Sequence, residues 1–305
     1  MSVAPWLDIF LLCHNRPEST KSAIESILEQ GGGGFRLIVS DNSSDMRVAE
    51  MVARDFPGVR IVQRGCLPAL AHFNACIAEA AADYFCLFHD DDLMGPDFVA
   101  EMQLTSMRYP DAVALGANAW VVNLEDGTRT ASVRAFGQYQ VIDSARELFH
   151  RYFGRHQTGI APFPGYVCRT ALAGSERIPE AGGKYADVTW LLRLATLGRV
   201  VWCNKPLMDY HIHGGNDGLR ESARDRLRFL GFIKHCPACV DQMGLSDYRY
   251  FLYKKLVAGQ AGKPLRAARM RRFLRWQRLR RHLRVADLGA LLRKISLKHL
   301  TRKPA

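Results

Sequence analysis

The sequence contains no apolar run long enough to cross a membrane. None of its 305 residues lies in a stretch that approaches the ~20 uncharged apolar residues a transmembrane helix requires. Residues 1–8 have neither the basic segment nor the apolar segment of a secretory signal. We therefore expect no membrane-spanning helix, no secretory signal and a cytoplasmic location.

A disulfide framework and a zinc site are also missing from the pattern. The eight cysteines are scattered, mostly inside apolar segments, which is typical of buried, reduced thiols. Cys236 and Cys239 lie beside His235, but no second pair has suitable spacing, and a structural zinc needs four protein ligands. We expect free thiols and no zinc.

The sequence has no glycine-rich phosphate loop. The run Gly31 to Gly34 follows a predicted helix and lacks the Gly-Lys-Ser/Thr ending of such a loop. The segment after the first predicted strand reads HNRPEST, which is not glycine-rich either. This argues against a nucleotidyltransferase that makes nucleotide sugars.

Acidic residues are almost absent from the C-terminal end. Residues 263–305 hold 15 Lys or Arg and one acid, Asp287, whereas residues 1–262 hold 27 basic and 29 acidic groups. The spacing of the apolar residues predicts a basic amphipathic helix with Phe273, Trp276, Leu279 and Leu283 on one stripe. This favours peripheral binding to an anionic membrane surface. A helix packed on the body and a nucleic-acid-binding segment are the alternatives.

Apolar runs of strand length alternate with helical patterns over the first hundred residues. The predicted strands are 8–13, 35–40, 59–63 and 84–88. One helix is predicted to start at Pro17, and another to span about 67–82. Later we expect a strand at 112–122, a helix at 144–153, a substrate loop at 156–166, a helix at 187–197, a strand at 200–203 and a flexible polar segment at 210–216. This alternation predicts an α/β fold with a mostly parallel sheet and helices on both faces.

Polar residues follow three of the predicted strands. His14-Asn15-Arg16 follows the first strand, Asp41-Asn42 the second, and His89 to Asp92 the fourth. Because open α/β sheets bind ligands at the carboxyl ends of their strands, we expect these segments to meet in one site. The triplet Asp90-Asp91-Asp92 favours a divalent cation such as Mn or Mg, since adjacent carboxylates repel without one. A solvated acidic turn is the alternative.

Taken in order, these motifs resemble the family 2 glycosyltransferases, inverting enzymes of the GT-A fold. The matching segments span about residues 7–217: Leu12-Cys13-His14-Asn15, Asp41-Asn42-Ser43-Ser44-Asp45, Phe73-Asn74, FHDDDLMGP, Ala186-Asp187, and Tyr210 to Asn216 with His211 and His213. The family pattern has a tyrosine where His14 stands, a proline at Leu12, and an acid at Ala186.

The resemblance implies roles for particular residues. Asp41 would contact the nucleobase or ribose, and the donor would also contact His14, Asn15, Arg16, Asn42, Asn74 and Asp90. Counting back from Pro96 places Asp91 on the second acid of the D-x-D motif and His89 on the first. The metal would be held by Asp91, Asp92 and His213, and we expect at most one of His211 and His213 to face the site.

Asp187 would be the general base in an inverting reaction. Inversion requires the acceptor hydroxyl to attack from the side opposite the leaving diphosphate, so the base must lie across the sugar from the metal. A first-turn acid is also common at helix starts for structural reasons.

We therefore predict a GT-A domain over residues 1–219, with a nucleotide-binding part (about 1–100) and an acceptor part (about 101–219), and a basic helical extension over 220–305. The expected donor is a UDP-sugar, with dTDP- or GDP-sugars as alternatives, and the expected acceptor is a glycan or lipid-linked glycan of a cell-surface polysaccharide. We expect peripheral attachment to the cytoplasmic face of the membrane and no nucleic-acid partner. A nucleic-acid-binding protein and a degenerate donor-binding transferase are the rival interpretations.

Overall fold

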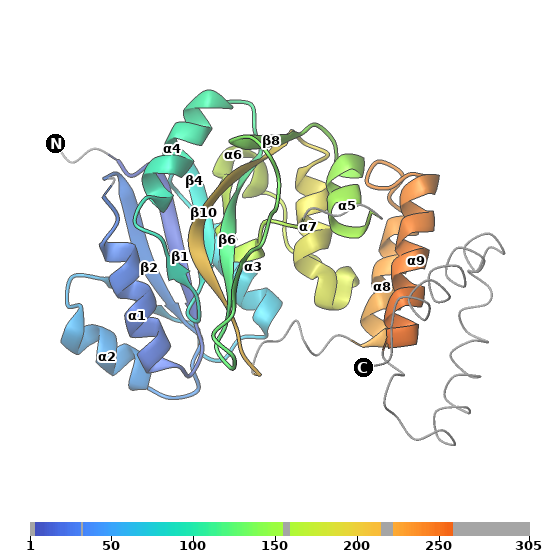
Figure 1. Ribbon diagram of the computed structural model, residues 1–305. Helices are drawn as coiled ribbons and strands as arrows, with labels where there is room; N and C mark the ends of the chain where they lie inside the picture. The colour runs from blue at the N-terminus through green and yellow to red at the C-terminus, as the bar shows by residue number, and fades with distance from the viewer. Residues whose placement is uncertain (1–3, 32, 155–158, 215–221, 259–305) are drawn as a thin grey trace, which may run out of the picture.

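A computed structural model describes residues 4–31, 33–154, 159–214 and 222–258, which form a wide sheet flanked by helices (Figure 1). The first half alternates β1 (Leu7–Cys13), α1 (Pro17–Leu28), β2 (Phe35–Asp41), α2 (Arg47–Asp55), β3 (Arg60–Gln63), α3 (Ala69–Glu79) and β4 (Tyr84–His89). The bounds of the four strands and of α3 confirm the predicted ranges to within about three residues, and α1 starts at Pro17 as predicted.

The second half is less regular. It contains β5 (Leu93–Met94), α4 (Phe98–Arg108), β6 (Ala114–Asn123), β7 (Arg129–Ala131), β8 (Tyr139–Ile142), α5 (Ala145–Phe153), the 3₁₀ turn η1 (Phe163–Gly165), β9 (Tyr166–Arg169) and α6 (Thr170–Ala173). It continues with the 3₁₀ segment η2 (Glu180–Tyr185), α7 (Ala186–Leu194), β10 (Val200–Ile212), α8 (Ala223–Lys234) and α9 (Gln242–Ala258).

One strand of this half was not predicted, and the expectation for another is wrong. β9, a strand of four residues, begins at Tyr166, the last residue of the predicted loop. β10 does not stop at Cys203 but runs to Ile212, so the first part of the predicted flexible segment is strand. Register shifts between Cys203 and Asp209 interrupt its pairing with β6, which explains why its pattern does not read as one strand. Gly215 and Asn216 lie outside the described residues.

The sheet order is β3-β2-β1-β4-β9-β6-β10-β5, with β7 beside β6 and β8 beside β10. Strands β1, β2, β3 and β4 are parallel, and so are β6 and β10. β9 is antiparallel to both β4 and β6 and joins the two parallel groups. The sheet is therefore mostly parallel, as predicted.

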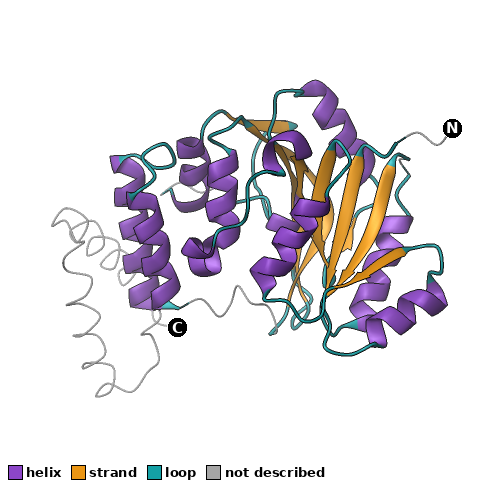
Figure 2. Cartoon of the chain, turned by 180° about the vertical axis from the view of Figure 1, so that it is seen from behind, coloured by secondary structure: helices purple, strands orange, loops and turns teal. Residues whose placement is uncertain are grey.

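Side chains of the central strands alternate between two apolar layers. In β1, Leu7, Ile9 and Leu11 pack with α1, α2 and α4, whereas Phe10 and Leu12 pack on the opposite side with α3 and α7. Figure 2 shows the sheet with helices on either side. Burial on both faces explains why β1 reads as a continuous apolar run.

The two C-terminal helices of the described chain share the core of the body. α8 begins with a capping box between Ser222 and Asp225, and α8 and α9 pack Phe229 and Tyr248 against Phe149 of α5. No helix in the described ranges is both long enough and apolar enough to cross a membrane. The basic tail, residues 259–305, lies outside the described residues.

Candidate active site

The polar segments after β1, β2 and β4 meet at one edge of the sheet. The backbone amide of His14 donates to Asp90 Oδ2 at 2.9 Å. The ring Nδ1 of the same histidine lies 2.8 Å from the backbone oxygen of Asn42. The three segments predicted to converge therefore do so.

Asn15 fixes the turn after β1 against the turn after β2. Its backbone has φ 56°, in the left-handed region that asparagine tolerates better than most residues. Its amide donates to Ser43 Oγ at 2.8 Å, and its side-chain oxygen accepts from the Ser44 amide at 2.9 Å. Nearby, the buried Asp41 accepts from the Ser43 amide at 3.0 Å.

Arg16 neutralises part of the acidic triplet. Its Nη1 lies 2.5 Å from Asp91 Oδ2 and 3.2 Å from Asp90 Oδ1. Burial alone would lower the pKa of this guanidinium, but the two carboxylates raise it, so the side chain stays charged. A cation is thus already beside Asp91, and a metal ion at the same carboxylate has to share it or displace the arginine.

The three carboxylates have different environments. Burial, opposed by Arg16 and the His14 amide, raises the pKa of Asp90 to about 6. Burial and the neighbouring Asp91 raise the pKa of Asp92 well above its usual value. Burial acts in the same sense on Asp91, but His89 and Arg16 beside it lower its pKa overall. The least buried of the three therefore ionises most readily.

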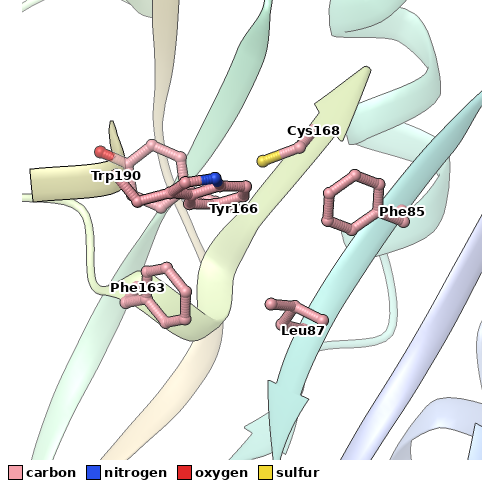
Figure 3. A pocket seen from close by; sticks show the side chains of 6 residues that line it. All are labelled: Phe85, Leu87, Phe163, Tyr166, Cys168 and Trp190. Atoms are coloured by element: carbon pink, nitrogen blue, oxygen red, sulfur yellow. The ribbon is translucent and has the colours of Figure 1, made fainter. Parts of the chain in front are cut away.

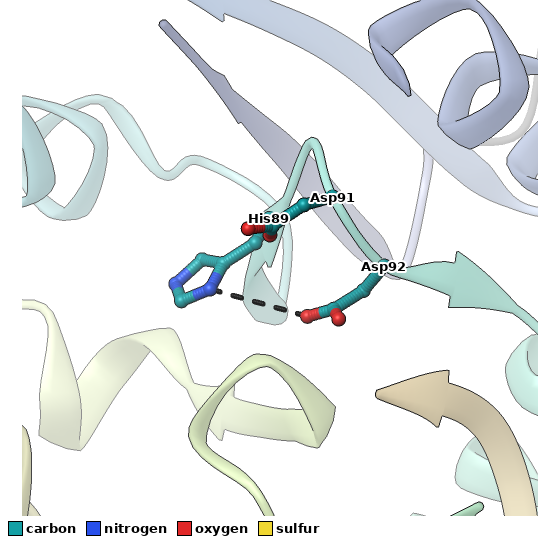
Figure 4. A group of neighbouring side chains, drawn as sticks. All are labelled: His89, Asp91 and Asp92. Atoms are coloured by element: carbon teal, nitrogen blue, oxygen red, sulfur yellow. Dashed lines mark ion pairs between the residues drawn. The ribbon is translucent and has the colours of Figure 1, made fainter. Parts of the chain in front are cut away.

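His89, Asp91 and Asp92 form a group whose potential ligand atoms all lie within 4.8 Å of one another (Figure 4). His89 Nδ1 is 4.0 Å from Asp92 Oδ2. Asp92 is 1% exposed, and its Oδ2 has no hydrogen-bond partner within the described part of the chain; neither has His89 Nε2. A buried carboxylate oxygen without a donor is unfavourable, so this group suits a cation.

His211 of β10 and His213, which follows the end of this strand, both contact the triplet, so the expectation that at most one would face it is wrong. His213 Nε2 lies 3.1 Å from Asp91 Oδ2, and His211 Nδ1 lies 2.6 Å from the Asp91 backbone oxygen. The His211 amide also donates to Asp92 Oδ1 at 2.9 Å. Residues i and i+2 of a strand lie on the same face, which explains why both histidines reach the same loop.

Asn42 and Asn74, two of the three predicted donor-binding asparagines, brace backbone segments. Asn42 donates to the Leu67 oxygen at 2.8 Å and accepts from the Leu67 amide at 2.7 Å. Asn74 makes the same pair of bonds with Ile178, at 3.1 and 2.8 Å. Each amide group is therefore already hydrogen-bonded at both ends, and a contact of either residue with a donor stays a prediction.

Asp187 is the second residue of α7 and follows a tight turn. Gly183 in that turn has φ 59°, and a Cβ there would lie 2.8 Å from Asp225 Oδ1 of α8, so the turn requires glycine. Asp187 Oδ1 accepts from the Val188 amide at 2.8 Å. Burial raises the pKa of Asp187 to about 6, although the Val188 amide opposes this shift.

The pKa of Tyr210, in β10, responds to the triplet and to Asp187. Burial raises its pKa to about 12, and the charges of Asp92, Asp91 and Asp187 all add to this effect. These carboxylates therefore lie within electrostatic range of one side chain. The arrangement provides an acidic group that could hold a cation and a separate carboxylate that is readily protonated.

Phe163 connects the triplet loop to α7. Its ring centroid is 6.2 Å from that of His89 and 6.1 Å from that of Trp190, and it stacks on Phe73 at 6.2 Å. It also lines a narrow apolar pocket with Phe85, Leu87, Tyr166, Cys168 and Trp190 (Figure 3). Sequence reasoning missed Phe163, because nothing in a loop sequence shows which rings it will contact.

Cys236 and Cys239 form a disulfide in the turn between α8 and α9, so the expectation of free thiols is wrong for this pair. The spacing of three residues brings their Cα atoms to 5.3 Å, a normal disulfide separation. The other six cysteines are free, as expected.

Comparison with known proteins agrees with this architecture. The model of a family described as "Glycosyl transferase family 2" matches residues 8–168. TarS 1–349 of S. aureus in complex with UDP-GlcNAc is similar in structure, with a TM-score of 0.62 at 11% identity, covering 82% of this chain and 72% of that chain. The same protein in complex with UDP gives 0.53 at 12% identity, covering 83% and 82%.

A longer structure of S. aureus TarS also gives a TM-score of 0.53, at 11% identity, and covers 83% of this chain but 49% of that chain. At these identities the likeness shows the fold, which is the GT-A arrangement of a mostly parallel sheet between helices. No curated protein matches the sequence.

Proposed function

The chain belongs to glycosyl transferase family 2, and from that premise we propose that it moves a sugar from a nucleotide diphosphate sugar to an acceptor hydroxyl with inversion. One observation carries the proposal: the potential ligand atoms of His89, Asp91 and Asp92 lie within 4.8 Å of one another, at the edge where the segments after β1, β2 and β4 meet. A cation-binding group and a separate protonatable carboxylate are what metal-assisted diphosphate departure and acceptor deprotonation require.

The donor half of the proposed site is the edge formed by β1, β2 and β4. Asp41 binds the nucleobase or ribose, and Arg16 and Asp90 lie toward the diphosphate, with His14, Asn15, Asn42 and Asn74 around them. We assign this part to residues 1–100 and the acceptor part to residues 101–219. A UDP-sugar is the favoured donor, because TarS was crystallised with UDP-GlcNAc and with UDP.

Asp91, Asp92 and His213 would hold the cation, Mn or Mg. The donor set fits, since Asp92 Oδ2 is buried without a hydrogen-bond partner among the described residues, and His213 Nε2 is 3.1 Å from Asp91. When bound, the cation neutralises charge on the departing diphosphate. Arg16, which lies beside Asp90 and Asp91, would bind the phosphates, for which a guanidinium is a good partner.

Asp187 would take the proton from the acceptor hydroxyl. Its carboxylate has no ion-pair partner among the described residues, and burial raises its pKa to about 6, so near pH 7 it is ionised yet basic enough to accept a proton. The turn at Gly183 and the packing of α8 against η2 hold this end of α7 in place.

The acceptor is proposed to be a lipid-linked glycan in the synthesis of a cell-surface polysaccharide. The support is the charge of residues 263–305, with 15 basic groups and one acid, which suits an anionic cytoplasmic membrane face. Removing residues 264–305 should leave donor hydrolysis intact and weaken binding to anionic vesicles. Unchanged vesicle binding would contradict the membrane assignment.

Calorimetry with UDP-, GDP- and dTDP-sugars, in Mn and then in EDTA, tests the central proposal. We expect one nucleotide class to bind, and EDTA to weaken that binding. Asp111→Asn is a matched control, because Asp111 is an exposed acid that precedes β6, at the opposite edge of the sheet. If no donor binds to folded protein in any condition, a transferase function is wrong.

A further inference from the structure

We propose that His89 is itself a ligand of the catalytic cation and that its nitrogen shifts the site's preference from Mg²⁺ toward transition-metal ions. This inference rests on the proposed function, and it adds a ligand to that site and a consequence for which metal is used. The position is the one at which the family pattern has the first acid of its motif, so a nitrogen stands here in place of a carboxylate oxygen.

The distances allow one ion to bind all three side chains of the group. Metal–oxygen and metal–nitrogen bonds of first-row ions are about 2.0–2.2 Å, so two ligands of one ion are up to ~4.2 Å apart. His89 Nδ1 and Asp92 Oδ2 are 4.0 Å apart, and the atoms of His89, Asp91 and Asp92 all lie within 4.8 Å (Figure 4). A shift of a few tenths of an ångström brings the set into range.

The atom that faces His89 is one that needs a partner. Asp92 Oδ2 is buried and accepts no hydrogen bond within the described ranges, whereas Oδ1 of the same carboxylate is taken by the His211 amide. The contact with His89 is too long for a hydrogen bond. An ion between the two side chains supplies what the carboxylate lacks.

Aromatic neighbours hold the imidazole ring in place. Phe73 stacks against it with ring centroids 6.0 Å apart, and Phe163 lies at 6.2 Å. Neither ring offers a lone pair or a donor to compete for the His89 nitrogens. Because the ring is already held between apolar partners, it loses little conformational entropy when it binds an ion. Effective metal sites are built from ligands that are ordered in this way.

Nitrogen and oxygen donors select different ions. Carboxylates suit Mg²⁺ and Mn²⁺, whereas imidazole favours later ions such as Co²⁺ and Zn²⁺. With His89 and His213 both present, the site has two nitrogens beside its carboxylates. We therefore expect Co²⁺ to bind much more tightly than Mg²⁺, with Mn²⁺ between them.

The variant His89→Asp restores a carboxylate at this position and is the direct test. Calorimetry on the full chain, with Co²⁺ or Mg²⁺ and with UDP present or absent, should show the ratio of the two affinities falling by at least about tenfold in His89→Asp. UDP is included because Arg16 beside Asp91 repels a bare ion. An unchanged ratio would overturn the inference, and His89→Asn provides a second variant if His89→Asp does not fold.

Pulsed electron paramagnetic resonance of bound Mn²⁺ gives an independent reading of the ligands. Nitrogen coupling should persist in His213→Asn and disappear in the double variant His89→Asp/His213→Asn. Loss of the coupling in His213→Asn alone would mean that His89 does not coordinate the ion.

The outcomes separate this inference from the proposed function. If wild-type protein binds no cation with or without UDP, the proposed metal chemistry is wrong. If wild type binds cations and His89→Asp binds them with the same selectivity, only the role of His89 is wrong.

Discussion

Two buried carboxylates at opposite ends of the same sheet differ in their hydrogen-bond partners. Asp8, at the start of β1, is fully buried and accepts two bonds from Arg36, both at 2.9 Å, and two more from the amides of Ala81 and Ala82. Asp92, after β4, is equally buried, yet one of its oxygens has no hydrogen-bond partner among the described residues.

The comparison separates an acid that supports the fold from one that is available to a ligand. A satisfied carboxylate contributes to stability, whereas a buried one that lacks a partner is unfavourable until a cation arrives. Substitution of Asp8, at the start of β1, should therefore change stability. Substitution of the acids after β4 should change activity. Substitutions at both ends, and changes of pH, test this separation.

The largest effect is expected at Asp91. Asp91→Ala should lower sugar transfer by about 10⁴-fold, because a cation at the departing diphosphate contributes several kcal/mol. Donor turnover with saturating Mn²⁺ measures this. Full activity would show that the reaction does not need a metal at Asp91. A large loss of stability would show that Asp91, like Asp8, supports the fold.

Asp187→Asn should lower transfer by about 10³-fold while leaving donor and metal binding intact, since general-base catalysis is worth on the order of 10²–10⁴. Single-turnover transfer and donor calorimetry on the same preparation measure the two properties. Loss of donor binding as well would assign Asp187 a role at the donor.

At the other end of the sheet, Asp8→Ala should reduce stability and leave the site unchanged. Arg36 and two backbone amides lose their acceptor, which should cost about 3 kcal/mol. Urea unfolding measures the loss, and donor affinity at a temperature well below unfolding is the control. Unchanged stability would show that Asp8 does not support the fold, and that it does not differ from Asp92 in this respect.

The pH dependence of transfer should follow Asp187. Its pKa of about 6 means that the carboxylate is protonated below that pH, so transfer should fall about tenfold per unit as the pH drops below 6. In metal-free protein the pKa of Asp90 is also about 6. Donor binding in Mn²⁺ that does not follow the same curve would assign the fall in transfer to Asp187.

The raised pKa values of Asp90 and Asp187 also predict in which direction pH changes the stability of the fold. A folded-state pKa raised above the unfolded value of 3.8 means that the folded state holds its proton more tightly. Metal-free protein should therefore lose part of its stability as the pH rises from about 4 to about 6.

The smallest effect is expected for Asp92→Asn in metal-free protein, which should be as stable as wild type or about 1 kcal/mol more stable. Burial and the neighbouring Asp91 disfavour the charged form, so removing the charge relieves an unfavourable arrangement. Unfolding in EDTA and then in Mn²⁺ measures it. The stabilisation by Mn²⁺ should be lost, and its persistence would show that Asp92 is not a ligand.

The sequence predicted the parts of the fold that depend on local pattern. The strands and helices up to β4 follow from apolar runs, Pro17 at a helix start and polar turns. β9 was missed because four residues after a loop carry too little pattern, and their pairing with β4 and β6 depends on contacts far along the chain.

For the candidate site, order along the chain singled out Asp41, Asp91 and Asp187, whose roles stay predictions, and connectivity brought the segments after β1, β2 and β4 together as expected. The contacts of His211 and Phe163 could not be predicted in this way, because they depend on which neighbours the folded chain supplies. His89 carried a signal, since it stands where the family pattern has an acid, but only the structure shows its nitrogen facing Asp92.

The position of strand β9 determines where two such proteins can be joined in protein engineering. It pairs with β4 on one side and with β6 on the other, so it is the boundary between the strands that carry the proposed donor residues and those that carry the proposed acceptor side. Chimeras of two such transferases should be joined on either side of residues 166–169, with this strand kept from one parent. A crossover within it would mix the two sets of cross-strand contacts that join the halves.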